Sequence, residues 1–171
     1  MRKHNGMRPQ DVVILLKIIS LADKPWQLKD LAHELSISAS EVSESLNRSY
    51  LAGLIDYDKR KVRRQSLMEF LQYGLHYVFP QHPGAVVNGI PTAHSHPFMR
   101  NHFESNEVYV WPDTLGKNRG HSIEPFYQKQ INAVKIDEAL YLLLALVDVI
   151  RVGRIREVNV AVDKLKEIIL S

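Results

Sequence analysis

The sequence predicts a mainly α-helical fold with one small β-hairpin, and three observations support this. Apolar residues recur at helical spacing over most of residues 9–78, and again from residue 136 onward. The helical period is lost at residues 54–65, and six of the eight prolines lie between residues 80 and 125. The chain therefore divides into a first region over 1–79, a Pro-rich irregular strap over 80–125 and C-terminal helices over 126–171.

The first region is expected to contain three helices separated by short breaks. Pro9 suits the first turn of a helix, and a second helix is expected to begin near Gln27. Ser38, with Glu41 three residues later, has the pattern of a capping box and so marks the start of a third helix. Gly53 is well placed to end that helix.

The remaining elements follow from where the period changes. Residues 54–65 are expected to form a short hairpin with a polar turn, followed by a helix over 67–78. In the strap, one strand is expected at 107–111. Two helices, over 136–152 and 154–170, are expected to close the chain.

Composition excludes several classes of function. The 171-residue chain has no cysteine, which rules out disulfides and cysteine-ligated zinc and favours a cytoplasmic location. No apolar stretch is long enough to cross a membrane, and the basic start of the chain does not have the pattern of a signal peptide. No phosphate-binding glycine loop or nucleophile motif is present, so we expect no catalytic residues, no cofactor and no enzyme activity.

The positive charge is concentrated in one short segment. Residues 1–78 hold twelve Lys and Arg against nine Asp and Glu, whereas the rest of the chain is balanced. Five of those twelve bases lie within residues 59–64. A cluster of this kind favours binding to a polyanion.

Two helices joined by a short break and followed by a basic hairpin are typical of a winged helix-turn-helix, in which the third helix enters the major groove of DNA. That helix is expected to bury Ala39, Val42, Leu46 and Tyr50. Its outer face is expected to contact DNA through Ser38, Ser40, Ser43, Glu44, Asn47 and Arg48. The hairpin, as a wing, is expected to bind the DNA backbone through Lys59, Arg60, Lys61, Arg63 and Arg64.

The stretch LKDLAHELSISASEVSESLNRSYLAGLID resembles the winged helix-turn-helix of MarR-like transcription regulators, over roughly residues 10–66. This resemblance implies a dimeric repressor or activator that binds a roughly palindromic operator. It also implies the DNA-reading role for the third helix and the wing role for residues 59–64. The evenly apolar segment 137–149 independently favours a homodimer, because such a helix needs partners on several sides.

The first hypothesis for function is therefore a sequence-specific regulator that binds double-stranded DNA as a homodimer. The second is a protein-interaction module, such as an antitoxin or a complex subunit. In that case the strap would dock a protein partner through His94, His96, Tyr109 and Trp111.

A third and weaker hypothesis is a metal-responsive regulator. His94 and His96 form a His-x-His pair in the strap, and imidazole is a ligand for zinc, copper and nickel. The sequence identifies no third ligand that must lie beside them. We therefore expect no metal site and keep these two histidines as weak candidates.

Overall fold

The computed structural model describes residues 5–171, so residues 1–4 of the predicted first region lie outside the described residues. The N-terminal helices are α1 (Pro9–Ser20), α2 (Leu28–Leu35) and α3 (Ala39–Leu51). They are followed by α4 (Arg64–Glu69), the π-helical segment η1 (Phe70–Gly74) and α5 (Leu75–Val78). The strap contains β1 (Val86–Pro91), the 3₁₀ turn η2 (Ala93–Ser95), α6 (Pro97–Arg100), β2 (Tyr109–Pro112) and β3 (Asn118–Ser122). The chain closes with α7 (Gln130–Ile136), α8 (Glu138–Val152) and α9 (Ile155–Ile169).

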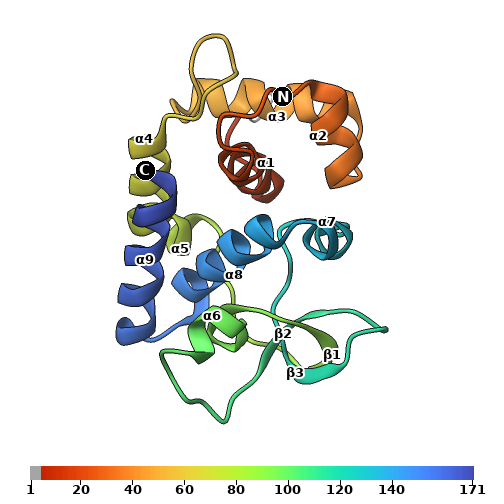
Figure 1. Ribbon diagram of the computed structural model, residues 1–171, viewed down its shortest axis with the longest axis vertical. Helices are drawn as coiled ribbons and strands as arrows, with labels where there is room; N and C mark the ends of the chain where they lie inside the picture. Colours follow the sequence, from red (N-terminus) through yellow and green to blue (C-terminus); the bar gives the residue numbers. More distant parts are fainter. Residues whose placement is uncertain (1–4) are drawn as a thin grey trace.

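The prediction of a mainly helical fold is confirmed, but the β-sheet lies in the strap, and the hairpin expected over 54–65 is reduced to a single bridge. Figure 1 shows α1–α3 at one end of the long axis, α7 and α8 in the middle, and the three strands at the other end. Helices α4 and α9 pack side by side along one edge. No helix among residues 5–171 has the length and apolar character needed to cross a bilayer.

The turn between α2 and α3 is as short as the sequence predicts. Ser36 adopts a left-handed conformation with φ of 56°, which reverses the chain within a few residues. The Ser38 hydroxyl accepts a hydrogen bond from the backbone N–H of Glu41 at 3.1 Å, and the Ser38 N–H donates to the Glu41 carboxylate at 3.3 Å. These bonds form the predicted capping box and fix where α3 begins.

The strap is more regular than the single strand expected at 107–111. β1 pairs antiparallel with both β2 and β3, and β2 also pairs with β3 in parallel over two residues. β1 and β2 are short, and each ends in proline. The alternation of apolar and polar residues that marks a strand is therefore hard to recognise in their sequences. The segment that joins β1 to α6 packs against α8, so the strap covers the core of the chain.

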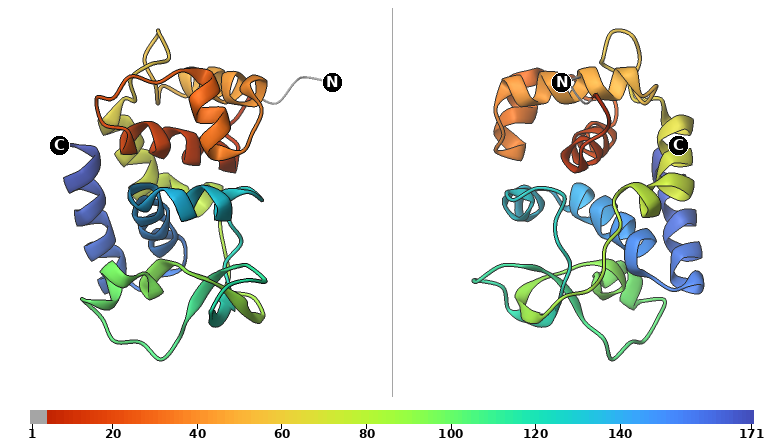
Figure 2. Two further views of the ribbon diagram at one scale, coloured as in Figure 1. Left: turned by 45° about the vertical axis from the view of Figure 1, so that its right-hand side comes forward. Right: turned by 180° about the vertical axis from the view of Figure 1, so that it is seen from behind.

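Helix α8 is the central helix of a single chain. Every residue from Leu143 to Arg151 is buried, and α1, α5, α7, α9 and η2 all pack against it. Figure 2 shows this enclosure from two further directions. The apolar character of this helix is therefore largely explained by packing within one chain, and it does not by itself indicate a second copy.

Candidate nucleic-acid interface

The outer face of α3 carries most of the polar residues that the sequence placed there. Ser38, Ser40, Ser43, Glu44 and Asn47 are all exposed. The helix lies at one end of the molecule, and no other helix of the part of the chain that the structure describes covers this face (Figure 1). Five of the six residues predicted to read DNA from this helix are thus accessible.

Arg48 is the exception, and its predicted contact with base edges is contradicted. Its side chain points inward, with 8% of the residue exposed, and forms a two-pronged ion pair with the fully buried Asp11 of α1. The two Arg48–Asp11 hydrogen bonds measure 2.8 and 2.7 Å. These bonds to the Asp11 carboxylate raise the pKa of Arg48 above its ordinary value, although burial opposes the shift. Arg48 therefore holds α3 onto α1 and is not free to contact a ligand.

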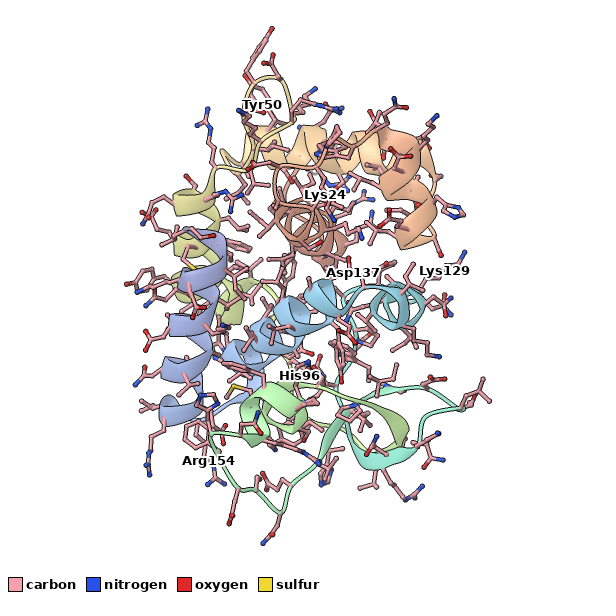
Figure 3. All side chains as sticks on the ribbon, viewed as in Figure 1. Lys24, Tyr50, His96, Lys129, Asp137 and Arg154 are labelled. Carbon is pink, nitrogen blue, oxygen red and sulfur yellow. The ribbon has the colours of Figure 1, made fainter. Side chains whose placement is uncertain are left out.

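Two residues expected in the core of α3 are instead on its surface. Ala39 is exposed, and Tyr50 is 36% exposed. The buried face of the helix includes Ser45, Arg48 and Ser49 in their place, and Asp11 holds Arg48 on this face. Tyr50 consequently lies at the end of α3 below the projecting loop, as Figure 3 shows.

The segment between α3 and α4, residues 54–63, is named here the basic loop. It contains one antiparallel bridge, Ile55 to Val62, where a longer hairpin was expected. Asp56 organises its turn by accepting hydrogen bonds from the backbone N–H groups of Arg60 and Lys61, at 2.8 and 3.1 Å. Burial alone would raise the pKa of Asp56, but these bonds and the charges of Lys61 and Arg63 outweigh it and lower the pKa. The loop projects beyond α3 (Figure 2).

The five predicted wing bases occupy different positions. Lys61 and Arg63 are exposed, and Lys59 donates a hydrogen bond to the Asn47 side chain. Arg60 folds back onto Trp26, with its guanidinium 4.1 Å from the centre of the ring and one N–H donated to the Trp26 carbonyl at 2.5 Å. The loop is therefore tied both to α3 and to the segment before α2.

Arg64 does not belong to the wing, and that prediction is corrected. It is the first residue of α4, and its guanidinium donates to the carbonyl of Ile169 at the end of α9, at 2.8 Å. A cation at a helix C-terminus satisfies a carbonyl that has no partner within the helix. Arg64 thus fastens α4 to α9.

Charge is distributed unevenly along the candidate interface. Glu41 and Glu44 lie exposed on the N-terminal half of α3, whereas Lys59 of the basic loop contacts Asn47 and Tyr50 on its C-terminal half. With Arg48 neutralised by Asp11, no cation on the outer face of α3 balances the two glutamates. A polyanion is therefore attracted to the loop end of this surface and repelled from the other end.

An aromatic cluster that was not predicted from the sequence lies at the loop end of α3. Tyr57 is 78% exposed and meets Tyr50 edge-on, with ring centres 5.9 Å apart. The Lys59 ammonium lies 5.9 Å from the centre of the Tyr50 ring, and Leu51 beside it is 66% exposed. A tyrosine inside a run of charged turn residues was the available signal.

The residues proposed as contact groups in the strap are mostly buried, so that prediction is contradicted. His94, His96 and Trp111 are 4%, 8% and 0% exposed. Trp111 donates its indole N–H to Asp148 at 2.7 Å. Tyr109 is half-buried and packs against the His94 ring. The strap uses these side chains to attach to the core.

The weak metal candidate receives no support from the geometry. One ring nitrogen of His94 contacts the Glu107 carbonyl, and the Nδ1 atom of His96 accepts from the backbone N–H of Phe98 at 3.1 Å. Within residues 5–171, no three potential metal-ligating side chains gather at one point.

Loop bases and tyrosines beside an exposed polar helix face thus form the candidate interface. Comparison with known proteins leaves the family open: no family model matches the chain, and no curated protein and no solved structure is significantly similar to it.

Proposed function

We propose that residues 9–63 act as a winged helix-turn-helix that binds double-stranded DNA and that the protein is a transcription regulator of the cytoplasm. The support is the pairing of two features on one surface: a capped polar helix and a projecting loop with exposed cations. Lys61 and Arg63 carry this proposal, because among the described residues neither forms an ion pair with a carboxylate. Their full charge is available to phosphate groups.

Within this proposal the roles of the residues differ from those the sequence predicts. Asn47 and Ser43 replace Arg48 as the groups that read base edges, since both are exposed on α3. Lys59 holds the Asn47 side chain in the free protein, so DNA must compete for that amide. The basic loop supplies most of the affinity, and α3 supplies discrimination between sequences.

A homodimer remains part of the proposal on one ground only. Helix-turn-helix proteins commonly bind two half-sites about one helical turn apart, and this arrangement requires two copies of the reading helix. Sedimentation of the protein with and without a two-fold symmetric duplex measures the copy number directly.

The proposal is tested by titrating duplex binding with salt. Removing one cation that neutralises a phosphate should reduce the slope of log K against log salt by about 0.9, so Lys61→Gln with Arg63→Gln should flatten it by about 2. The matched control is Lys129→Gln with Arg154→Gln, which removes the same charge from exposed residues away from the basic loop (Figure 3). Equal reductions of the slope in both double variants, or no duplex binding at low salt, would overturn the proposal.

A second function is favoured by a specific observation, the apolar cluster at the loop end. Leu51, Tyr50 and Tyr57 are exposed at the C-terminal end of α3, and Glu41 and Glu44 are exposed further along the same helix. An apolar cluster with acidic residues on the same helix suits a basic protein partner. In that case duplex binding is absent, and Glu44→Gln abolishes binding of the partner whereas Lys61→Gln retains it. The salt titration therefore distinguishes the two functions.

A further inference from the structure

A pocket of about 320 Å³ lies behind the basic loop, and none of its lining residues comes from α3. Its walls are the last turn of α1, the segment that leads into α2, and the returning side of the loop. The volume is within the range of pockets that enclose small molecules. The pocket thus lies apart from α3, although Lys61 of the basic loop belongs both to its lining and to the surface proposed to bind DNA.

The charges around this pocket are strongly unbalanced. Lys24, Arg60, Lys61 and Arg64 line it, and Asp23 is the single acid that does. Within the described residues, none of the four cations forms an ion pair with a carboxylate. The two arginines each place one N–H on a backbone carbonyl, which holds their guanidinium groups in position at the pocket.

The rest of the lining is apolar. Trp26 and Pro25 form one wall with the end of α1, and Val62 of the loop contributes from the other side. Trp26 is 7% exposed and is covered on one face by Arg60, so Pro25 and Ala22 supply most of the accessible apolar surface. The pocket therefore combines a cationic rim with an apolar wall.

We propose that this pocket binds a nucleoside monophosphate. A phosphate monoester carries close to two negative charges at neutral pH and accepts several hydrogen bonds, so it suits four cations better than a monocarboxylate does. The remaining N–H groups of Arg60 and the ammonium groups of Lys24 and Lys61 are the donors for its oxygens. The base has a flat apolar face, which fits against the apolar lining at Pro25 and Ala22.

The experiment is calorimetric titration of the full chain with AMP, with adenosine and inorganic phosphate as separate partial ligands. AMP is expected to bind once per chain, at least about ten-fold more tightly than either part, because only the whole molecule uses both the rim and the wall. Lys24→Gln with Lys61→Gln should weaken AMP binding by about ten-fold or more. Lys29→Gln with Lys129→Gln, which removes two exposed charges outside the pocket, should leave the binding of AMP unchanged.

Four outcomes overturn the assignment: no AMP binding at about 5 mM, equal binding of adenosine, equal binding of inorganic phosphate, or equal weakening in both double variants. A thermal melt of each variant shows that it is folded. The titration contains no DNA, so its failure leaves the proposed function intact, and failure of duplex binding leaves this site intact.

Discussion

The N-terminal helices and the strap are both fastened by a buried aspartate paired with an arginine, but they use their polar side chains in opposite ways. Around Asp11 and Arg48, the remaining polar residues of α3 face outward. In the second pair, the Arg151 guanidinium lies 3.0 Å from the Asp148 carboxylate. Thr92 and Trp111 of the strap point inward to the same carboxylate. The same kind of ion pair therefore leaves the outer face of α3 available for a partner, whereas in the strap the polar and aromatic side chains are buried.

The difference follows from which groups donate hydrogen bonds to each aspartate. Among residues 5–171, Asp11 accepts side-chain hydrogen bonds from Arg48 alone, together with one from the backbone N–H of Arg8. Arg48 lies on a helix that already packs through its apolar face. Asp148 is fully buried and accepts from Thr92, Trp111 and Arg151, and two of these belong to the strap. Burial raises the pKa of the Asp148 carboxyl, and these donors and the charge of Arg151 oppose the rise. An irregular segment is thus attached to the core through one polar centre.

The largest expected effect comes from removing either aspartate. Asp11→Ala and Asp148→Ala each leave a buried arginine without its partner, which should lower the free energy of unfolding by about 3–5 kcal/mol. Asp148→Ala should cost more, since Thr92 and Trp111 lose their acceptor as well. Denaturant unfolding measures both. The double variant Asp11→Leu with Arg48→Met should recover most of the free energy of unfolding that Asp11→Ala loses. If Asp148→Ala lowers the free energy of unfolding by less than about 1 kcal/mol, Asp148 does not fasten the strap.

A pH effect on stability is expected next in size, and it should arise in the strap. Burial lowers the pKa of His96 to about 4, from an ordinary value of 6.5. Between these two values the unfolded chain binds a proton that the native chain does not, so stability should fall as pH is lowered from 6.5 toward 4. Protonation would also remove the acceptor that the Phe98 N–H requires.

The matched variant for this effect is His96→Asn. Asparagine can accept the same backbone N–H at the start of α6 but does not titrate, so melting temperature should depend less steeply on pH. The slope is compared between pH 4 and 6.5 by thermal denaturation. An unchanged slope would show that His96 titrates normally in the folded protein.

A smaller effect is expected on DNA affinity at the loop tip. Tyr57→Ala removes an exposed ring from the side of the cationic loop, and duplex affinity should fall by about five-fold with little change in stability. Tyr77→Ala is the control, since Tyr77 is 80% exposed on α5, outside the candidate interface. Fluorescence anisotropy of a labelled duplex measures both. Equal affinities for the two variants would remove Tyr57 from the interface.

The smallest effect is expected at Glu44, whose charge opposes the proposed ligand. Glu44→Gln should raise duplex affinity by about two- to five-fold at low salt, because one exposed like charge is worth a fraction of a kcal/mol to about 1 kcal/mol. The gain should vanish at high salt. A loss of affinity would instead mean that Glu44 accepts a hydrogen bond from a base.

Local patterns determined much of the first region. The spacing of apolar residues located α1–α3, and Ser38 with Glu41 located the start of α3, because a cap depends only on neighbouring residues. The same patterns found the helix after the basic loop but missed its π-helical segment η1 and its start at Arg64. They also placed α8 and α9 within two residues of their observed starts.

The sequence by itself determined where α1–α3, α8 and α9 lie and where cations gather, since both depend on residues close together in the chain. Only the tertiary structure decided that Arg48 turns toward Asp11 and that Trp111 turns toward Asp148, 37 residues away in each case. A buried charge has to find a partner wherever the fold brings one close, and periodicity along the chain contains no information about that partner. Which polar side chains remain on the surface is therefore decided by the packing of distant segments.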